Sequence, residues 1–247
     1  MPAGSSVPEW ICATVPKRGN RPEENEDASA AAPDGLRFAV ADGATEGWES
    51  GPWAVHLVAA YIARPPKPAD FADWLTAVQK WAPPAREGPQ AWYVAEKEEQ
   101  GSFATLAGLE LRRSRRPAEW TWRAGAIGDS CLFHVRGTEL ALAFPLESAG
   151  AFGNRPALVP SAAVLKCPDP EWCAGRCRPG DVLLLATDAG AARLFDPDTR
   201  AAALAAVGAA LAAGDPAPLS DWCRTVQDTT NDDVSVVAVR LPTPAPD

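Results

Sequence analysis

The stretch Phe38-Ala39-Val40-Ala41-Asp42-Gly43 is the segment around which the rest of the chain can be interpreted. Its apolar run is typical of a buried strand, and the Asp-Gly pair marks an abrupt end of that strand. A carboxylate in this position costs free energy unless a partner compensates its charge. The hexapeptide therefore indicates either a strand that ends in a solvated turn or a strand whose aspartate binds a cation, which Gly43 would let the backbone approach closely.

Length and charge restrict the possible partners. The chain has 247 residues, which suits one large domain or two small ones. A net charge of −9 argues against nucleic acid or an anionic membrane as the main partner. The first ten residues lack the apolar region of a secretion signal, and no run approaches the roughly 20 apolar residues that span a bilayer. We therefore expect a cytoplasmic protein with reduced cysteines, formed by one domain over residues 1–241 and a proline-rich tail over 242–247.

The order of apolar patterns predicts a chain that mixes strands and helices. Predicted strands cover residues 10–15, 36–41, 103–111, 120–127, 131–135, 140–144, 181–186 and 234–241. Predicted helices cover residues 48 or 52 to 63, 70–81 with Asp70 as N-cap, 90–100, 199–213 and 219–227. The triplet Gly128-Asp129-Ser130 is typical of a hairpin turn between two of the strands.

The segment 145–178 is predicted to be an irregular surface insertion that shapes access to a site. Three of the chain's cysteines, Cys167, Cys173 and Cys177, lie within it. A structural zinc site usually has four ligands, and no fourth cysteine or histidine lies nearby. Zinc is therefore the less favoured interpretation of these thiols.

Aspartates recur where predicted strands begin or end. Asp42 and Asp188 end strands, Asp232 begins one, and Asp129 lies in the predicted turn. In an antiparallel sheet the end of one strand and the start of its neighbour share an edge, so these residues can converge on one rim. Carboxylates that close would repel one another and raise their pKa values unless cations were bound. Oxygen ligands alone favour Mg²⁺ or Mn²⁺, and two such ions about 3.5–4 Å apart are an established solution for phosphoester hydrolysis.

A charged loop precedes the opening stretch. Glu24-Asn25-Glu26-Asp27 places three carboxylates in four residues. Such a segment is either a solvated loop or the outer shell of a metal site. Arg18 and Arg21 lie just upstream and can pair with an anionic ligand.

Six short motifs, taken in order, resemble those of the metal-dependent Ser/Thr protein phosphatases of type 2C, the PPM family, and most closely its bacterial single-domain members. The resemblance extends from about residue 18 to residue 240. The motifs are Asn25-Glu26-Asp27, Val40-Ala41-Asp42-Gly43, Gly101-Ser102 with Thr105, Gly128-Asp129-Ser130, Leu184-Leu185-Ala186-Thr187-Asp188 and Asp232-Asp233-Val234-Ser235.

This resemblance implies an α+β fold, an antiparallel two-sheet β-sandwich flanked by helix pairs in four αββα layers. It also implies hydrolysis of phosphoserine and phosphothreonine on proteins by a hydroxide that bridges two Mg²⁺ or Mn²⁺ ions. The implied partners are a phosphorylated protein substrate and an opposing Ser/Thr kinase, and the implied state is a monomer.

The resemblance assigns site residues by their motif positions. The catalytic aspartates Asp42, Asp188 and Asp232 would hold the metals, with Asp42 bridging both and the Gly43 carbonyl binding one. Glu26 and Asp27 would hold metal-bound waters, and Asp129 would join Asp188 at a third metal.

Three positions depart from the family pattern. The position of the family's phosphate-binding arginine is Pro22 here, and Arg21 lies one residue further from Asp27. The histidine that often follows the Asp-Gly pair is Ala44, and the arginine common after Gly-Asp-Ser is Cys131. Phosphate binding is therefore assigned to Arg21 or Arg18.

Two alternatives to a protein phosphatase remain open on the sequence. One is a catalytically silent member that binds phosphoproteins or acts as a scaffold, which the intact aspartate set disfavours and the displaced arginine permits. The other is a phosphatase that acts on a small phosphorylated metabolite, because the insertion at 145–178 carries no readable specificity.

Overall fold

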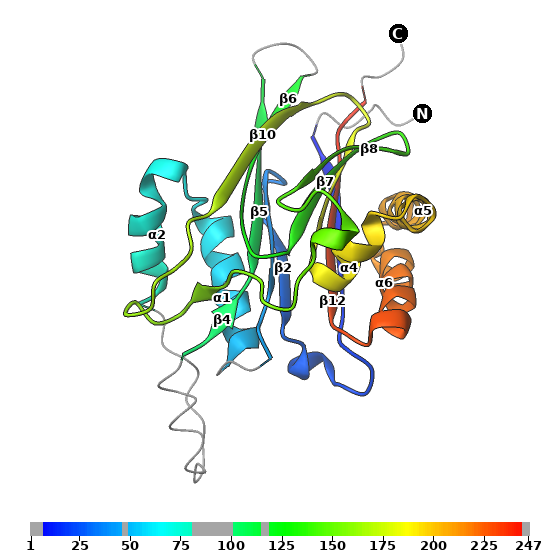
Figure 1. The fold of residues 1–247 in the computed structure, drawn as a ribbon. Coiled ribbons are helices and arrows are strands. Elements are labelled where there is room, and N and C mark those ends of the chain that lie inside the picture. Colours follow the sequence, from blue (N-terminus) through cyan, green and yellow to red (C-terminus); the bar gives the residue numbers. More distant parts are fainter. Residues whose placement is uncertain (1–6, 46–48, 81–100, 115–118, 244–247) are drawn as a thin grey trace.

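The structure is a computed structural model that describes residues 7–45, 49–80, 101–114 and 119–243. Two five-stranded antiparallel sheets pack face to face, and helices cover both outer faces (Figure 1). This arrangement confirms the predicted α+β class, with its two-sheet sandwich between helical layers. None of the described helices is long and apolar enough to cross a bilayer.

The strands of each sheet come from distant parts of the chain. In spatial order the first sheet contains β1 (Glu9–Val15), β12 (Val234–Arg240), β11 (Val182–Ala186), β7 (Cys131–Arg136) and β8 (Glu139–Phe144). The second contains β10 (Glu171–Cys177), β6 (Trp120–Ile127), β5 (Leu106–Arg113), β3 (Arg37–Asp42) and β2 (Asp27–Ala31). A small third sheet pairs β4 (Phe103–Ala104) with β9 (Val159–Pro160).

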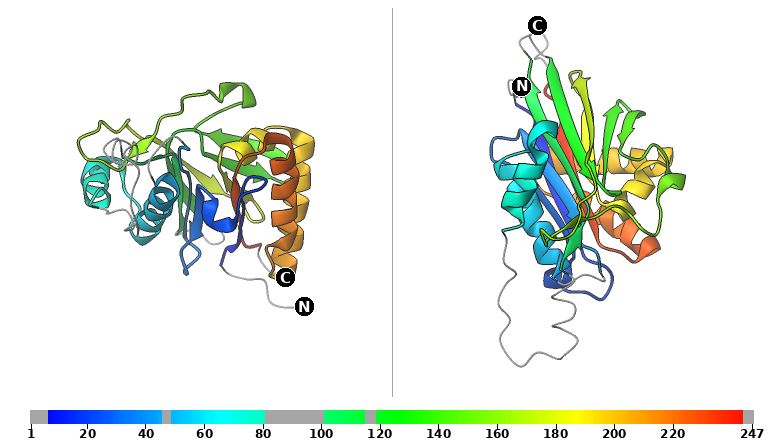
Figure 2. Two further views of the ribbon diagram at one scale, coloured as in Figure 1. Left: turned by 90° about the horizontal axis from the view of Figure 1, so that it is seen from below. Right: turned by 60° about the vertical axis from the view of Figure 1, so that its left-hand side comes forward.

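Two groups of helices complete the layers, as Figure 2 shows from two further directions. The second sheet packs against α1 (Ser50–Ala63), which also contacts α2 (Phe71–Val78). The first sheet packs against α4 (Asp188–Leu194), α5 (Pro197–Ala213) and α6 (Ala217–Thr230). Single turns of 3₁₀-helix occur at η1 (Pro22–Glu24), η2 (Pro68–Asp70) and η3 (Ala149–Ala151).

The apolar run of β3 is continuous because both of its faces are buried. Phe38 and Val40 pack between the two sheets, whereas Ala39 and Ala41 pack against α1. Side chains alternate along a strand, so Asp42 is expected on the same side as Phe38 and Val40. Strand β3 therefore directs its terminal carboxylate toward the space between the two sheets.

The predicted hairpin at residues 128–130 is wrong. The strands on either side of this turn, β6 and β7, belong to different sheets. Gly128 has φ +98°, a conformation that L side chains rarely adopt, and a Cβ there would lie 2.7 Å from the Ala157 carbonyl oxygen. The Gly-Asp sequence that is typical of hairpins forms here a connection that crosses from one sheet to the other.

The segment 145–178 is less irregular than predicted, because it contains β9 and the edge strand β10. Strand β10 was missed because glycine and cysteine weaken its pattern. Its glycine makes room for an aromatic ring, since a Cβ on Gly175 would lie 2.7 Å from the Trp122 side chain. In the reverse pairing, a Cβ on Gly125 would lie 2.6 Å from Trp172.

Other boundaries differ in smaller ways. Strand β2 and helix α4 were not predicted, and the strand predicted at 103–111 divides into β4 and β5 at Thr105. Asp70 occupies the predicted N-cap position of α2, but its carboxylate accepts a hydrogen bond from the backbone N–H of Lys67 and none from the first turn of α2. The helix predicted at 90–100 lies outside the described residues.

Candidate metal centre

Four aspartates named from the sequence lie where the open ends of the two sheets meet. Asp27 and Asp42 are directly paired across β2 and β3 in the second sheet. Asp188 follows β11, and Asp232 precedes β12, its neighbour in the first sheet. The predicted single rim is thus shared by two facing sheets, with Asp129 at the crossover between them.

Buried hydroxyl groups connect the two sides of this rim. The Thr187 hydroxyl donates to Asp27 Oδ2 at 2.8 Å and accepts from the Ser235 backbone N–H at 3.0 Å. The Asp42 backbone N–H donates to Thr105 Oγ1 at 3.1 Å, and that hydroxyl lies 2.7 Å from Ser130 Oγ. These side chains fix the carboxylate-bearing strand ends relative to one another.

The carboxylates carry more negative charge than the protein compensates. Burial, followed by the charges of Asp27, Asp188, Asp232 and Asp129, raises the pKa of Asp42 from 3.8 to about 10. Burial raises the pKa of Asp27 well above its usual value despite the hydrogen bond from the Thr187 hydroxyl. The pKa of Asp188 is also raised, and that of Asp129 rises to about 6, in both cases chiefly by burial. Convergent charge of this kind favours a bound cation.

A lysine that the sequence analysis did not select lies at the edge of the cluster. Lys17 Nζ lies 3.4 Å from Glu26 Oε2 and 3.7 Å from Asp232 Oδ1. Burial alone would lower the pKa of Lys17, but the charges of Asp233, Glu26 and Asp232 raise it. Lys17 therefore stays protonated and offsets part of the negative charge at the rim.

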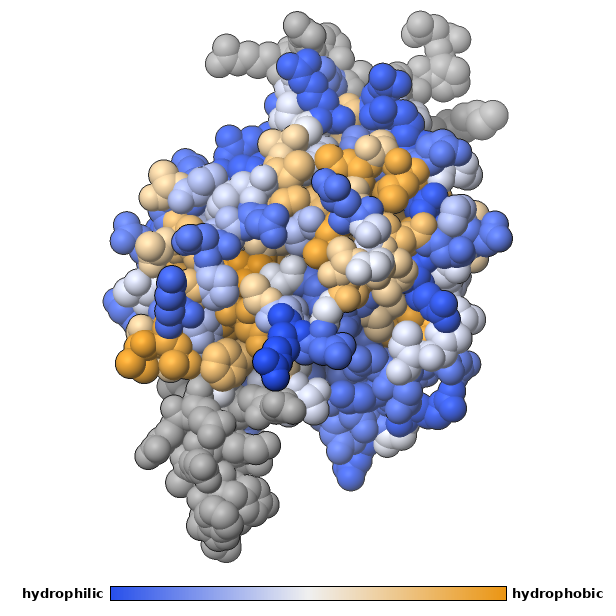
Figure 3. Space-filling view, in the orientation of Figure 1, coloured by the Kyte–Doolittle hydropathy of each residue, from blue (hydrophilic) through white to orange (hydrophobic). Residues whose placement is uncertain are grey.

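Asp233 is a second residue that the sequence analysis did not assign. Its side chain is buried and accepts backbone hydrogen bonds from Lys17 at 2.6 Å and from Glu26 at 3.0 Å. It thereby holds both ends of the charged β1–β2 connection. Figure 3 shows hydrophilic side chains gathered at the lower right of this face, over that connection.

Two local features fit a hard divalent cation. A Cβ on Gly43 would lie 2.6 Å from the backbone of Ser50 and 2.8 Å from the Glu26 carbonyl oxygen, so only glycine fits beside Asp42. Asp129 Oδ1 is buried and has no hydrogen-bond partner among the described residues. With a donor set of oxygens only, these features suit Mg²⁺ or Mn²⁺.

The rim carboxylates do not gather tightly around a single point in the described structure. Oxygens bound to a single Mg²⁺ at 2.0–2.1 Å lie at most about 4.2 Å apart. Among the described residues, only His134, Cys177 and Asp181 form a trio of potential ligand atoms within 4.8 Å of one another. Among the described residues, no three rim carboxylates therefore bring one oxygen each within 4.8 Å of one another.

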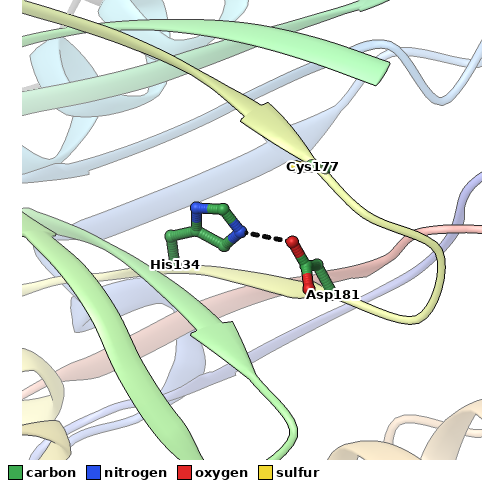
Figure 4. A group of neighbouring side chains, drawn as sticks. All are labelled: His134, Cys177 and Asp181. Carbon is green, nitrogen blue, oxygen red and sulfur yellow. Dashed lines mark hydrogen bonds and ion pairs between the residues drawn. The ribbon is translucent and has the colours of Figure 1, made fainter. Parts of the chain in front are cut away.

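The trio of His134, Cys177 and Asp181 lies at the other end of β11, away from the rim aspartates (Figure 4). Its contacts are those of a structural cluster. Asp181 accepts hydrogen bonds from His134 Nε2 at 2.7 Å, from the Arg136 guanidinium at 3.0 and 3.1 Å, and from the Arg178 backbone at 2.8 Å. Burial raises the pKa of the Cys177 thiol to about 12. The carboxylate is saturated by these donors, and the other cysteines of the predicted insertion, Cys167 and Cys173, are not part of the cluster.

Neither arginine predicted to bind phosphate is directed to the carboxylates by a contact in the described structure. Arg18 Nη2 pairs with Asp228 Oδ1 at 2.5 Å, and both side chains are 63% exposed. Arg21 is exposed, and its backbone N–H donates to Glu24 at 2.7 Å. The structure brings the metal-ligand candidates together but leaves these two cations at the periphery.

A cavity of about 510 Å³ opens beside Asp42. The cavity wall includes residues next to the Asp-Gly pair, residues around β4, and part of the connection between β8 and β9. These residues are Asp42, Ala44, Thr45, Gly101, Phe103, Thr105, Asn154, Arg155, Pro156 and Leu158. A ligand in this cavity would lie against the proposed bridging aspartate.

Comparisons with known proteins place the fold. No family model matches the sequence, and no curated protein matches it. Among solved structures, the catalytic domain of the serine/threonine protein phosphatase PstP, in complex with two manganese ions, matches with a TM-score of 0.63 and 16% identity over 96% of this chain and 100% of that one.

Two further solved structures have a similar fold. PppA, a regulatory component of T6SS in Pseudomonas aeruginosa, has a TM-score of 0.62 and 20% identity over 95% of this chain and 98% of its own. The photosystem II phosphatase PBCP has a TM-score of 0.64 and 16% identity over 94% and 98%. The chain therefore has the fold of the PPM-type Ser/Thr phosphatases.

Proposed function

We propose that this chain is a metal-dependent protein Ser/Thr phosphatase. The observation that carries the proposal is the convergence of Asp27, Asp42, Asp129, Asp188 and Asp232 at one end of both sheets, where burial, followed by the charges of the other four, raises the pKa of Asp42 to about 10. Uncompensated carboxylates destabilise a folded protein, so this arrangement has its physical explanation in bound cations. The shared fold supports the same assignment.

The proposed ligands follow the motif positions. Asp42 would bridge two cations, the Gly43 carbonyl would bind one of them, and Asp188 and Asp232 would bind the other. Glu26 and Asp27 would hold coordinating waters, and Asp129 would join Asp188 at a weaker third position. When bound, Mg²⁺ or Mn²⁺ ions supply Lewis-acid activation of water and neutralise charge on the phosphoryl group.

The chain's own residues orient this set. Thr187 directs the Asp27 carboxylate through its 2.8 Å hydrogen bond, and Asp233 fixes the segment that carries Glu26. Lys17 keeps a positive charge between Glu26 and Asp232. These contacts hold the carboxylates in position before any ligand arrives, so that little reorganisation accompanies the reaction.

The biological setting follows from the proposed reaction. The substrate is a phosphorylated protein, and an opposing Ser/Thr kinase supplies the phosphate. We further propose that the enzyme is a cytoplasmic monomer formed by a single catalytic domain over residues 1–241. The net charge of −9 is compatible with a catalyst that attracts divalent cations.

Hydrolysis of p-nitrophenyl phosphate tests this proposal. We expect turnover with Mn²⁺ or Mg²⁺, none with EDTA, and a large loss in Asp188→Asn. The matched control is Asp221→Asn, because that carboxylate is 73% exposed on α6 and is not one of the proposed metal ligands. Absence of metal-dependent turnover in the wild type would instead support the catalytically silent alternative.

A substrate panel then separates the two enzymatic alternatives. Phosphoserine and phosphothreonine peptides should be hydrolysed with higher kcat/KM than small phosphorylated metabolites at equal Mn²⁺ concentration. The opposite preference would replace the protein substrate with a metabolite.

A further inference from the structure

The cavity beside Asp42 has an anionic side and a cationic side. Asp42 contributes the carboxylate, while Arg155 is the sole cation among the described residues that line the cavity. Arg155 is exposed, and the described structure gives it no hydrogen bond or ion pair. An unpaired arginine in the wall of a cavity that Asp42 also lines is available to bind an anionic ligand.

The backbone near Arg155 is anchored although its side chain is exposed. The carbonyl of Ala157 lies so close to Gly128 that a Cβ there would approach it to 2.7 Å. Val159 is fully buried, pairs with Ala104, and accepts a hydrogen bond from Trp53 Nε1 at 2.9 Å. These contacts, two and four residues after Arg155, fix where its side chain originates relative to the crossover that carries Asp129.

The other cationic side chains considered for this role either pair with carboxylates or do not line the cavity. Lys17 lies between Glu26 and Asp232, and Arg18 pairs with Asp228. Arg21 does not belong to the described wall of this cavity. Arg155 is thus the described cation best placed to meet an anion that enters beside Asp42.

We propose that Arg155 binds the phosphoryl group of the substrate, in the role that the sequence assigned to Arg21 or Arg18. This inference rests on the proposed phosphatase function. A guanidinium can donate two parallel hydrogen bonds to phosphate oxygens, which suits a dianion better than a single ammonium does. The apolar side chains of Phe103, Pro156 and Leu158 leave the adjoining space for the carbon atoms of the phosphorylated residue.

Binding of inorganic phosphate by the Mn²⁺-loaded protein, measured by calorimetry, tests the proposal without turnover. Loss of charge-assisted hydrogen bonds in Arg155→Ala should raise the Kd for phosphate about tenfold or more. Arg155→Lys should recover part of this loss. Arg21→Ala and the edge-strand variant Arg176→Ala, whose side chain is 68% exposed, should leave the Kd unchanged.

Kinetics and metal binding supply the second readout. Arg155→Ala should raise the KM for both p-nitrophenyl phosphate and a phosphoserine peptide, while the Mn²⁺ concentration that gives half-maximal thermal stabilisation stays the same. A KM increase confined to the peptide, with unchanged phosphate binding, would overturn the proposal. Weaker phosphate binding in Arg21→Ala but not in Arg155→Ala would overturn it as well.

The outcome separates this inference from the function on which it rests. Phosphate binding that depends on Arg155 without any turnover would support the phosphate site and refute the phosphatase proposal. Turnover with phosphate binding that is insensitive to Arg155 would support the phosphatase and refute the site. A wild-type protein that does not bind phosphate would refute the role of Arg155.

Discussion

Replacing Asp42 with asparagine should stabilise the metal-free protein. The pKa of Asp42 rises from 3.8 to about 10 because of burial and four neighbouring carboxylates. A carboxyl group whose pKa is raised by folding contributes most to stability below its unfolded pKa, and this contribution declines as pH rises toward the folded pKa. The decline is about 1.4 kcal/mol per pH unit, so at pH 7.5 the cost has an upper limit of about 5 kcal/mol.

The expected gain is smaller than this limit. Lys17 and entering water or salt ions screen part of the repulsion, so we expect the neutral side chain of Asp42→Asn to stabilise the metal-free protein by about 2 kcal/mol at pH 7.5. The gain should shrink as pH falls and should be smallest at pH 4.5, close to the unfolded pKa of 3.8, because the folded carboxyl is protonated there and the unfolded carboxyl begins to bind a proton as well. Urea unfolding in EDTA at about pH 4.5, 6.0, 7.5 and 9.0 measures the stability difference between the two proteins and its change with pH.

Divalent ions should make wild type more stable than Asp42→Asn, the reverse of the order expected without metal. At a concentration 100 times its Kd, a ligand that binds only the folded state stabilises it by about 2.7 kcal/mol per site. Wild type should therefore gain stability with Mn²⁺, and Asp42→Asn should gain little. Asp221→Asn is the control for loss of one surface charge. A metal-free Asp42→Asn protein that is less stable than wild type at pH 7.5, or a difference that does not change with pH, would contradict a raised pKa of Asp42 in the folded protein.

Three further variants test separate parts of the structure. Asp181→Asn removes the buried anion that pairs with Arg136 and should lower the free energy of unfolding in urea by about 3 kcal/mol while metal-dependent turnover persists. Because folding lowers the pKa of Asp181, this stabilisation should be present above the unfolded pKa and should fade as pH falls through the folded pKa. Loss of metal-dependent turnover in this variant would contradict a purely structural role of Asp181. Gly43→Ala should abolish stabilisation by Mn²⁺ in a thermal scan, because its Cβ would lie 2.6 Å from Ser50; an unchanged shift would contradict the close approach. Asp233→Asn should raise the Mn²⁺ concentration needed for half-maximal turnover by about tenfold, on the scale of a lost charge-assisted hydrogen bond, and unchanged metal dependence would remove its positioning role.

Local signals in the sequence were sufficient to predict strand ends and their aspartates. Asp42, Asp188 and Asp232 each lie beside an apolar run, and the structure places all three at the same end of the sandwich. The apolar continuity of β3 also predicted a buried strand, and the structure buries it on both faces. These features depend only on short stretches of chain, whose pattern survives in any tertiary context.

Features that depend on distant partners were not predictable from local patterns. Gly128 is typical of a hairpin, but whether β6 and β7 pair is decided by β11 and β10, which lie far along the chain. Strand β10 has a weak pattern because Gly175 is matched to Trp122 across the sheet. A local reading of each segment contains no information about such a match.

The supporting charges were missed for the same reason. Lys17 and Asp233 are separated by 216 positions, and only the fold brings the Lys17 backbone N–H to within 2.6 Å of the Asp233 carboxylate. Asp233 directly precedes β12, whose residues from Val234 to Val239 are all buried, so strand alternation offered no signal that singles it out. Arg155 gave no local signal, because an arginine in an irregular segment is ordinarily solvent-exposed.

The most direct test of the two-metal centre is an anomalous difference map from crystals grown with Mn²⁺. A two-metal centre predicts two strong peaks between Asp42, Asp188 and Asp232, with Asp42 shared by both, and their loss in crystals of Asp42→Asn. A map without peaks at this rim would contradict a metal centre formed by these aspartates. Mn²⁺ bound instead at His134 and Asp181 would contradict it equally.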